Sequence, residues 1–153
     1  MASEKVIKAL NEARARELTA ILQYMAQHYE LADQGFDKLG DAVKKIAIEE
    51  MKHAEALAER ILFLNGVPTS TPDGKAKKGE EIPAMLTTNM KLEDDAVKMY
   101  NASAKLCVEE SDQVSKDIFE KLLKEEEDHW NYFDNVRTHV KQLGAAYLAT
   151  LTG

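Results

Sequence analysis

Residues that end helices occur at only a few places in this sequence, and they divide it into four long segments with helical periodicity. The chain of 153 residues contains only 7 Gly and 3 Pro, so it lacks the turns that a β-sandwich would need. Apolar residues recur at the three- and four-residue spacing of amphipathic helices. The sequence therefore predicts an all-α protein with helices over about 4–32, 38–64, 83–110 and 112–143, and a short fifth helix over about 145–151.

The connections between these segments predict how the helices are arranged. Short connections around Gly35 and Ser111 make the first two helices antiparallel, and likewise the last two. A helix of this length measures about 40 Å, and only the polar connection 65–82 is long enough to run along the bundle and join two parallel helices. This is the ferritin-like arrangement of a four-helix bundle with one long crossover. We expect residues 1–153 to form a single domain of this kind.

Two Glu-x-x-His pairs lie inside the second and fourth segments, in IEEMKHAEAL and KEEEDHWNYF. Residues three positions apart share one face of a helix, and both pairs lie in register with the apolar residues of their helices. All four side chains are therefore expected to be buried: Glu50, His53, Glu126 and His129. Burying a carboxylate without a partner costs roughly several kcal/mol, so the pattern indicates a centre that binds a ligand.

The first and third helices each place one more glutamate on an apolar face, Glu17 and Glu93. Each precedes the glutamate of a Glu-x-x-His pair by 33 positions, and each is followed seven positions later by a tyrosine, Tyr24 or Tyr100. We interpret the chain as an inexact duplication of a helix pair, with a pseudo-twofold axis between the halves. The tyrosines are expected to donate hydrogen bonds to these carboxylates across the bundle. A simple packing role is the alternative for both.

Four carboxylates and two imidazoles suit two metal ions, and this mixture of ligands favours iron or manganese. One Glu from each of two helices with a Glu-x-x-His pair from each of the other two is the pattern of ferritin-like di-iron proteins. Six residues are the expected catalytic ligands. Glu17 and Glu93 are expected to be terminal carboxylates, and Glu50 and Glu126 are expected to bridge the two metals. His53 and His129 are each expected to bind one metal.

Composition argues against several other classes of function. The net charge of −7 disfavours a nucleic-acid surface and is compatible with a cation as substrate. The single cysteine, Cys107, provides neither an intrachain disulfide nor a thiolate metal site. The N-terminal stretch MASEKVIKALNEA is charged almost at once, so we expect no signal peptide, no membrane segment and a cytoplasmic location.

The stretches IEEMKHAEALAERILFLNGVP and VSKDIFEKLLKEEEDHW closely resemble the second and fourth helices of bacterioferritins. The resemblance covers essentially the whole chain, and the six ligand positions match without gaps. It implies a hollow homo-oligomer, typically of 24 subunits, that oxidises Fe(II) with dioxygen or hydrogen peroxide and stores ferric mineral. A small ferredoxin is an expected partner for iron release.

The resemblance also implies haem shared between two subunits, bound by one methionine from each, and the matching position is Met51. This residue is turned about 100° from the ligand face of its helix. The first helix carries a second apolar stripe that includes Leu22 and Tyr29, and a helix with two apolar faces favours a second partner. The alternative is a methionine packed in a dry interface.

The sequence departs from the family at three positions. Lys45 and Glu49 stand where relatives often carry a His and an Asp that form an iron site on the cavity wall, so that site is in doubt. Tyr100 stands where an aliphatic residue is expected. Two symmetric tyrosines are similar to those of rubrerythrins, and a rubrerythrin-like peroxidase without mineral storage is the alternative function. The rubredoxin-like Cys pair of that family is missing from this chain.

Overall fold

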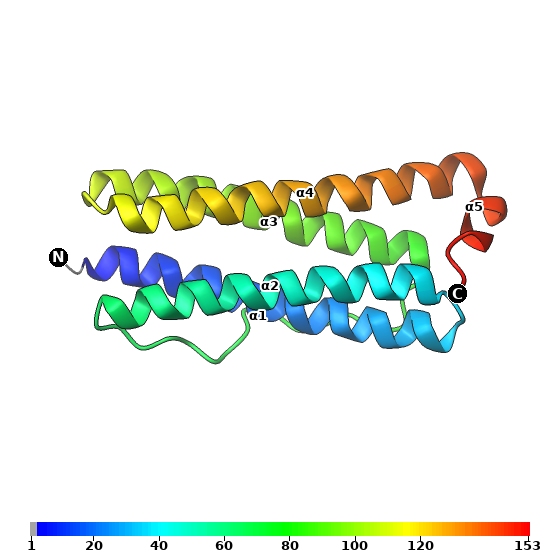
Figure 1. The fold of residues 1–153 in the computed structure, drawn as a ribbon, viewed down its shortest axis with the longest axis horizontal. Coiled ribbons are helices and arrows are strands. Elements are labelled where there is room, and N and C mark those ends of the chain that lie inside the picture. Colours follow the sequence, from blue (N-terminus) through cyan, green and yellow to red (C-terminus); the bar gives the residue numbers. More distant parts are fainter. Residues whose placement is uncertain (1–2) are drawn as a thin grey trace.

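The computed structural model describes residues 3–153, which form four long helices in two antiparallel pairs (Figure 1). The helices are α1 (Glu4–Asp33), α2 (Asp37–Phe63), α3 (Ile82–Glu109) and α4 (Gln113–Leu143), followed by the short α5 (Ala145–Ala149). Helix α1 pairs with α2, and α3 pairs with α4. The all-α, ferritin-like fold predicted from the sequence, with one long crossover and a short fifth helix, is confirmed.

Local sequence signals explain where the helices begin and turn. The Ser3 hydroxyl accepts a hydrogen bond from the Val6 amide at the start of α1, and the Asp112 carboxylate accepts one from the Ser115 amide at the start of α4. Gly35, between α1 and α2, has a φ of 82°, which glycine adopts without strain. The two helix pairs reverse direction over short connections, residues 34–36 and 110–112.

The long crossover, residues 65–81, lies along α1 and is held there by polar side chains of that helix (Figure 1). The Thr19 hydroxyl accepts hydrogen bonds from the backbone amides of Asp73 and Gly74, at 2.9 and 3.0 Å. The Gln23 amide group donates to the Lys77 carbonyl at 2.9 Å and accepts from the Lys77 amide at 2.7 Å. The crossover therefore returns the chain to the N-terminal end of α3 along a defined path.

The apolar core is divided into two clusters, one on each side of the middle of the bundle. The cluster near α5, which includes Leu86 and Phe133, we call the α5-end cluster. The cluster near the start of α1, which includes Leu10 and Phe119, we call the N-end cluster. Each long helix passes from one cluster to the other through a level that carries a buried glutamate. The middle of the bundle is therefore a layer of ionisable groups between two hydrophobic ends.

Candidate metal centre

Six buried side chains from the four long helices meet in this middle layer. Helices α1 and α3 each contribute one glutamate, while α2 and α4 each contribute a glutamate and a histidine. The six residues are at most 4% exposed and are Glu17, Glu50, His53, Glu93, Glu126 and His129. The structure thus brings together all six candidate ligands that the spacing predicts.

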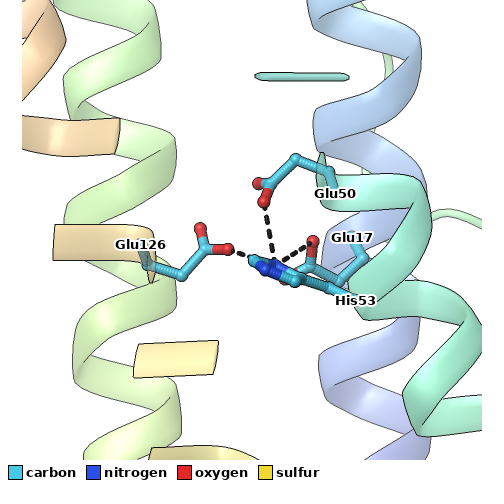
Figure 2. Close-up of side chains that lie close together, drawn as sticks. All are labelled: Glu17, Glu50, His53 and Glu126. Atoms are coloured by element: carbon cyan, nitrogen blue, oxygen red, sulfur yellow. Dashed lines mark ion pairs between the residues drawn. The ribbon is translucent and has the colours of Figure 1, made fainter. Parts of the chain in front are cut away.

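One set of potential ligands surrounds His53 (Figure 2). The Nδ1 atom of His53 lies 2.8 Å from Oε1 of Glu126 and 3.0 Å from Oε1 of Glu50. It lies 3.5 Å from Oε2 of Glu17. Figure 2 shows the three carboxyl groups approaching this nitrogen from different sides. The four ligand atoms lie within 4.8 Å of one another. The distances of 2.8, 3.0 and 3.5 Å from the nitrogen to the three oxygens are compatible with one ion whose bonds are about 2 Å long.

A second set surrounds His129 and is related to the first by the internal duplication. The Nδ1 atom of His129 lies 3.3 Å from Oε1 of Glu50 and 3.6 Å from Oε1 of Glu93. Glu126 completes this set, again with all ligand atoms within 4.8 Å. Because Glu50 and Glu126 belong to both sets, the two candidate positions share two carboxylates. The two imidazole rings are stacked with their centroids 6.0 Å apart.

The hydrogen-bonding state of these groups tests whether they fit metal ions. One side-chain atom of every member has no hydrogen-bond partner, although all six atoms are buried: Glu17 Oε2, Glu50 Oε1, His53 Nδ1, Glu93 Oε2, Glu126 Oε1 and His129 Nδ1. The atoms lie close together but form no hydrogen bonds with one another. Buried polar atoms without partners are rare and costly. Cations at the two centres would satisfy all six.

The pKa values of these groups show how the charges conflict when no metal balances them. Burial, helped by repulsion from Glu50, raises the pKa of Glu17 to about 8, and burial raises the pKa of Glu126 well above its ordinary value. Burial alone would lower the pKa of both histidines, but contacts with the carboxylates raise it to about 10 for His53 and about 12 for His129. Protons therefore balance the carboxylates when metal does not.

Two tyrosines cross the bundle to the carboxylates of α1 and α3. The Tyr24 hydroxyl, on α1, donates to Oε1 of Glu93 on α3 at 2.7 Å. The Tyr100 hydroxyl, on α3, donates in the opposite direction to Oε1 of Glu17 on α1. Both tyrosines are completely buried. In each case the phenol binds Oε1 of the carboxylate, and Oε2 of the same carboxylate has no hydrogen-bond partner.

Two further carboxylates contact the candidate ligand histidines. The sequence analysis did not predict these contacts. Oε2 of Glu125, on α4, lies 2.7 Å from Nε2 of His53 on α2, and Oε2 of Glu49, on α2, lies 2.7 Å from Nε2 of His129 on α4. A carboxylate at Nε2 leaves Nδ1 as the atom that faces the centre. Both residues directly precede a candidate ligand glutamate, and this repeated position is the signal that could have revealed them.

Met51 lies apart from the metal centre, on the outer side of α2, and its side chain is 52% exposed. The nearby face of α1 also carries exposed apolar residues, including Leu22 and Tyr29. Two alanines that follow helical spacing from Met51 do not share its exposed surface, because Ala47 and Ala54 are buried in the bundle. The open apolar surface around Met51 is therefore narrower than helical spacing alone indicates.

Fold and site together define a ferritin-like protein, a four-helix bundle that carries a two-metal site of carboxylates and histidines. In agreement, the family model of the ferritin-like domain matches residues 7–143. Among curated proteins, a bacterioferritin of Desulfovibrio desulfuricans is 44% identical over 149 residues, which cover 97% of this chain and 83% of that protein. A bacterioferritin of Rhodobacter capsulatus is 37% identical over 147 residues, covering 96% and 91%.

A solved structure gives the same result. The X-ray structure of the Desulfovibrio desulfuricans bacterioferritin, described with its di-iron site in different catalytic states, superposes with a TM-score of 0.95 at 44% identity. The match covers 97% of this chain and 87% of that one. The chain belongs to the bacterioferritin family, as the resemblance predicted. In the part of the chain that the structure describes, no helix combines the length and apolar character needed to cross a bilayer.

Proposed function

We propose that this chain is the subunit of an iron-storage shell and acts as a ferroxidase. Fe(II) is oxidised to Fe(III) by dioxygen or hydrogen peroxide at the di-iron centre, and the product is stored as ferric mineral inside the homo-oligomer. The observation that carries this proposal is the pair of buried ligand sets that share Glu50 and Glu126 and leave six polar atoms without partners. An iron pair held there supplies two electrons to the oxidant.

The proposed ligand roles follow from membership of the two sets. Glu50 and Glu126 occur in both sets and are proposed to bridge the irons. Glu17 and His53 occur only in the first set, and Glu93 and His129 only in the second, so each pair would serve one iron. Four carboxylates around two ions favour Fe(III) over Fe(II), because the higher charge gains more from nearby negative charge.

We propose that Tyr24 and Tyr100 hold the terminal carboxylates in place. Each phenol occupies one oxygen of Glu93 or Glu17, and this bond restricts rotation of the carboxylate. The carboxylate then keeps its orientation while iron enters and leaves. Because each terminal carboxylate has its own tyrosine, the ligands of both irons are held in the same way. A single tyrosine would hold the terminal carboxylate of only one iron.

Iron retention tests storage against the alternative of a rubrerythrin-like peroxidase, which the bacterioferritin relatives do not favour. The assembled protein, given Fe(II) and air and then passed through a desalting column, is expected to keep far more iron than the two ions per chain of the centre. Glu50→Ala should lose rapid oxidation, while Glu55→Ala, at an exposed position on the same helix, should behave as wild type. Retention limited to two ions per chain, with continued peroxide consumption, would instead support the peroxidase.

Haem bound between two subunits is the second cofactor that we propose. The half-exposed thioether of Met51 is a suitable axial ligand, and the exposed apolar residues of α1 and α2 favour a second copy of the chain as partner. Each subunit would then contribute one Met51. The structure of a single chain is compatible with this arrangement, since the Met51 side chain is not enclosed by the helices of its own chain.

Replacing Met51 tests this haem assignment. Met51→Ala is expected to abolish the absorption bands of a haem with two methionine ligands, whereas Met99→Ala on α3 should retain them. The pyridine haemochrome assay on purified protein measures the haem that remains. Because Met51 is half exposed and Met99 is only partly buried at the edge of the N-end cluster, both variants should fold and should still bind metal at the centre. Full haem content in Met51→Ala would show that another residue is the axial ligand.

The remaining expectations concern the whole assembly. We propose that residues 1–153 act as one ferritin-like domain, that about 24 copies form the shell, and that the protein works in the cytoplasm with a small ferredoxin as electron donor for iron release. Lys45 is a cation and a poor metal ligand, and Glu49 is engaged with His129. We therefore propose that the iron site on the cavity wall seen in the family pattern is absent from this chain.

A further inference from the structure

A small polar pocket of about 210 Å³ is bounded by α1, the crossover and α3, and none of the six candidate metal ligands lines it. Asp73 and Asp95 are the carboxylates among the described residues that line it. Four cationic residues line it as well: Arg16, Lys75, Lys77 and Lys91. The lining therefore carries four positive and two negative charges, in a chain whose net charge is −7. A local excess of positive charge favours an anionic ligand.

The two carboxylates of this pocket are already paired with cations. Oδ2 of Asp73 lies 3.0 Å from Nη2 of Arg16, and Oδ2 of Asp95 lies 2.9 Å from Nζ of Lys91. The two lysines of the crossover take no part in these ion pairs, and neither forms an ion pair elsewhere within residues 3–153. Two positive charges of the pocket thus remain available to a ligand.

Arg16 also has an unused hydrogen-bond donor. Its side chain is 22% exposed, but its Nε atom is buried and has no hydrogen-bond partner. A buried donor without a partner is unfavourable, because it has given up its bond to water. Guanidinium groups bind oxyanions well, since their N–H donors are fixed in one plane and carry a positive charge. An oxyanion bound beside this guanidinium would provide the missing acceptor.

The backbone of the crossover is fixed at this pocket by two buried side chains of α1. The Thr19 hydroxyl accepts from the Gly74 amide at 3.0 Å, and the Gln23 side chain bonds to both backbone groups of Lys77, at 2.7 and 2.9 Å. Lys75 lies between these two anchors. The exposed lysine side chains can turn toward an ion without reordering the backbone, which lowers the entropy cost of binding.

We propose that this pocket binds a small tetrahedral oxyanion, for which inorganic phosphate is the probe. Arg16, Lys75 and Lys77 would hold it through charge-assisted hydrogen bonds. The pocket volume of about 210 Å³ is below the range of about 300–1,000 Å³ of pockets for larger organic ligands, so it favours a single small ion. The bound ion would connect α1 to the crossover and restrain the crossover further. The site is separate from the di-iron centre and does not depend on the proposed ferroxidase function.

Equilibrium dialysis of the assembled protein against radioactive phosphate measures this binding. The protein is freed of iron first, so that ferric ions do not bind the phosphate. Wild type should bind one phosphate per chain at millimolar concentration or below. The double variant Lys75→Gln with Lys77→Gln is expected to weaken binding at least about tenfold, because it removes two charged hydrogen-bond donors. Lys75→Arg with Lys77→Arg keeps both charges and should keep binding.

The matched control is Lys78→Gln with Lys105→Gln, which removes the same charge at exposed positions outside the pocket. Its affinity for phosphate should stay within about threefold of wild type, because water and salt screen distant charges. Hydrogen exchange gives a second measurement on wild type. Phosphate should slow exchange of the backbone amides of the crossover.

Three results would overturn the proposal. Wild type that binds no phosphate at millimolar concentration shows that the pocket is not an oxyanion site. Undiminished binding by Lys75→Gln with Lys77→Gln shows that the phosphate binds elsewhere. Equal weakening in this variant and in the control variant shows a general attraction of charge instead of a site. Should the glutamine variant fail to assemble, slowed or unchanged exchange of the crossover amides in wild type decides between the site and its absence.

Discussion

Glu126→Gln is expected to lower the affinity of the centre for its metal pair by more than about 100-fold, beyond the effect usual for residues that only support a ligand. Glu126 belongs to both ligand sets, so one substitution removes a negative charge from both metal positions. Titration with Co(II), a spectroscopic substitute for Fe(II), should show at most one weakly bound ion per chain. The initial rate of Fe(II) oxidation should fall in parallel, because an isolated iron lacks its partner for the two-electron step.

The same substitution is expected to have the opposite effect on the metal-free protein. Burial raises the pKa of Glu126 well above its ordinary value, which shows that the folded state disfavours its ionised form. An amide of the same size avoids that cost, so the metal-free variant should be at least as stable as wild type, by up to about 1 kcal/mol.

Thermal unfolding with and without Co(II) measures both effects. Wild type should gain stability from the metal, and Glu126→Gln should gain little. Glu127→Gln is the matched control, because Glu127 is the exposed neighbour of Glu126. Two tightly bound Co(II) per chain in Glu126→Gln, together with a normal oxidation rate, would remove Glu126 from the ligand set.

Metal binding at neutral pH is expected to release at least two protons per chain. The pKa values of His53 and His129, about 10 and about 12, lie above pH 7, so both imidazoles are protonated in the metal-free state. The pKa of Glu17, about 8, keeps this carboxyl mostly protonated as well. A metal ion needs neutral imidazoles and ionised carboxylates. Glu50, with a pKa lowered to about 2 by both histidines despite its burial, is already ionised and contributes no proton.

The release of these protons determines how the apparent affinity for metal changes with pH. Metal competes with them, so the apparent affinity should rise with pH, by about tenfold per pH unit for each proton released, and should weaken steadily toward acid. Calorimetric titration with Co(II) in two buffers of different ionisation enthalpy counts the protons. Affinity that is independent of pH between 6 and 8, with no proton release, would contradict the charge balance described here.

Helix geometry explains why the candidate ligands were predictable. A spacing of three residues on a helix places two side chains on one face, and the repeated interval of 33 positions relates the two halves of the chain. Glu17 and Glu93 lie at the same level as the Glu-x-x-His pairs because the helix pairs are long, straight and joined by short turns.

Contacts between helices that depend on side-chain direction were not predictable. Glu49 and Glu125 belong to runs of acidic residues and are partly exposed, so their sequence resembles that of ordinary surface charges. Only the packing of α2 beside α4 shows that each carboxylate binds the histidine of the opposite helix. The burial of Ala47 likewise depends on the rotation of α2 about its own axis. Periodicity in the sequence defines that rotation only to within part of a turn.

The division of the core into an α5-end cluster and an N-end cluster affects how the protein opens. Without metal, the middle of the bundle holds a layer of buried ionisable groups, and the backbone amides around them should exchange their hydrogens faster than in the metal-bound protein. With metal at the candidate centre, the six ligands would connect all four long helices at this level. Iron would thus connect the two hydrophobic clusters into one cooperative unit. A subunit without iron would be more flexible than the iron-loaded subunits of the same shell.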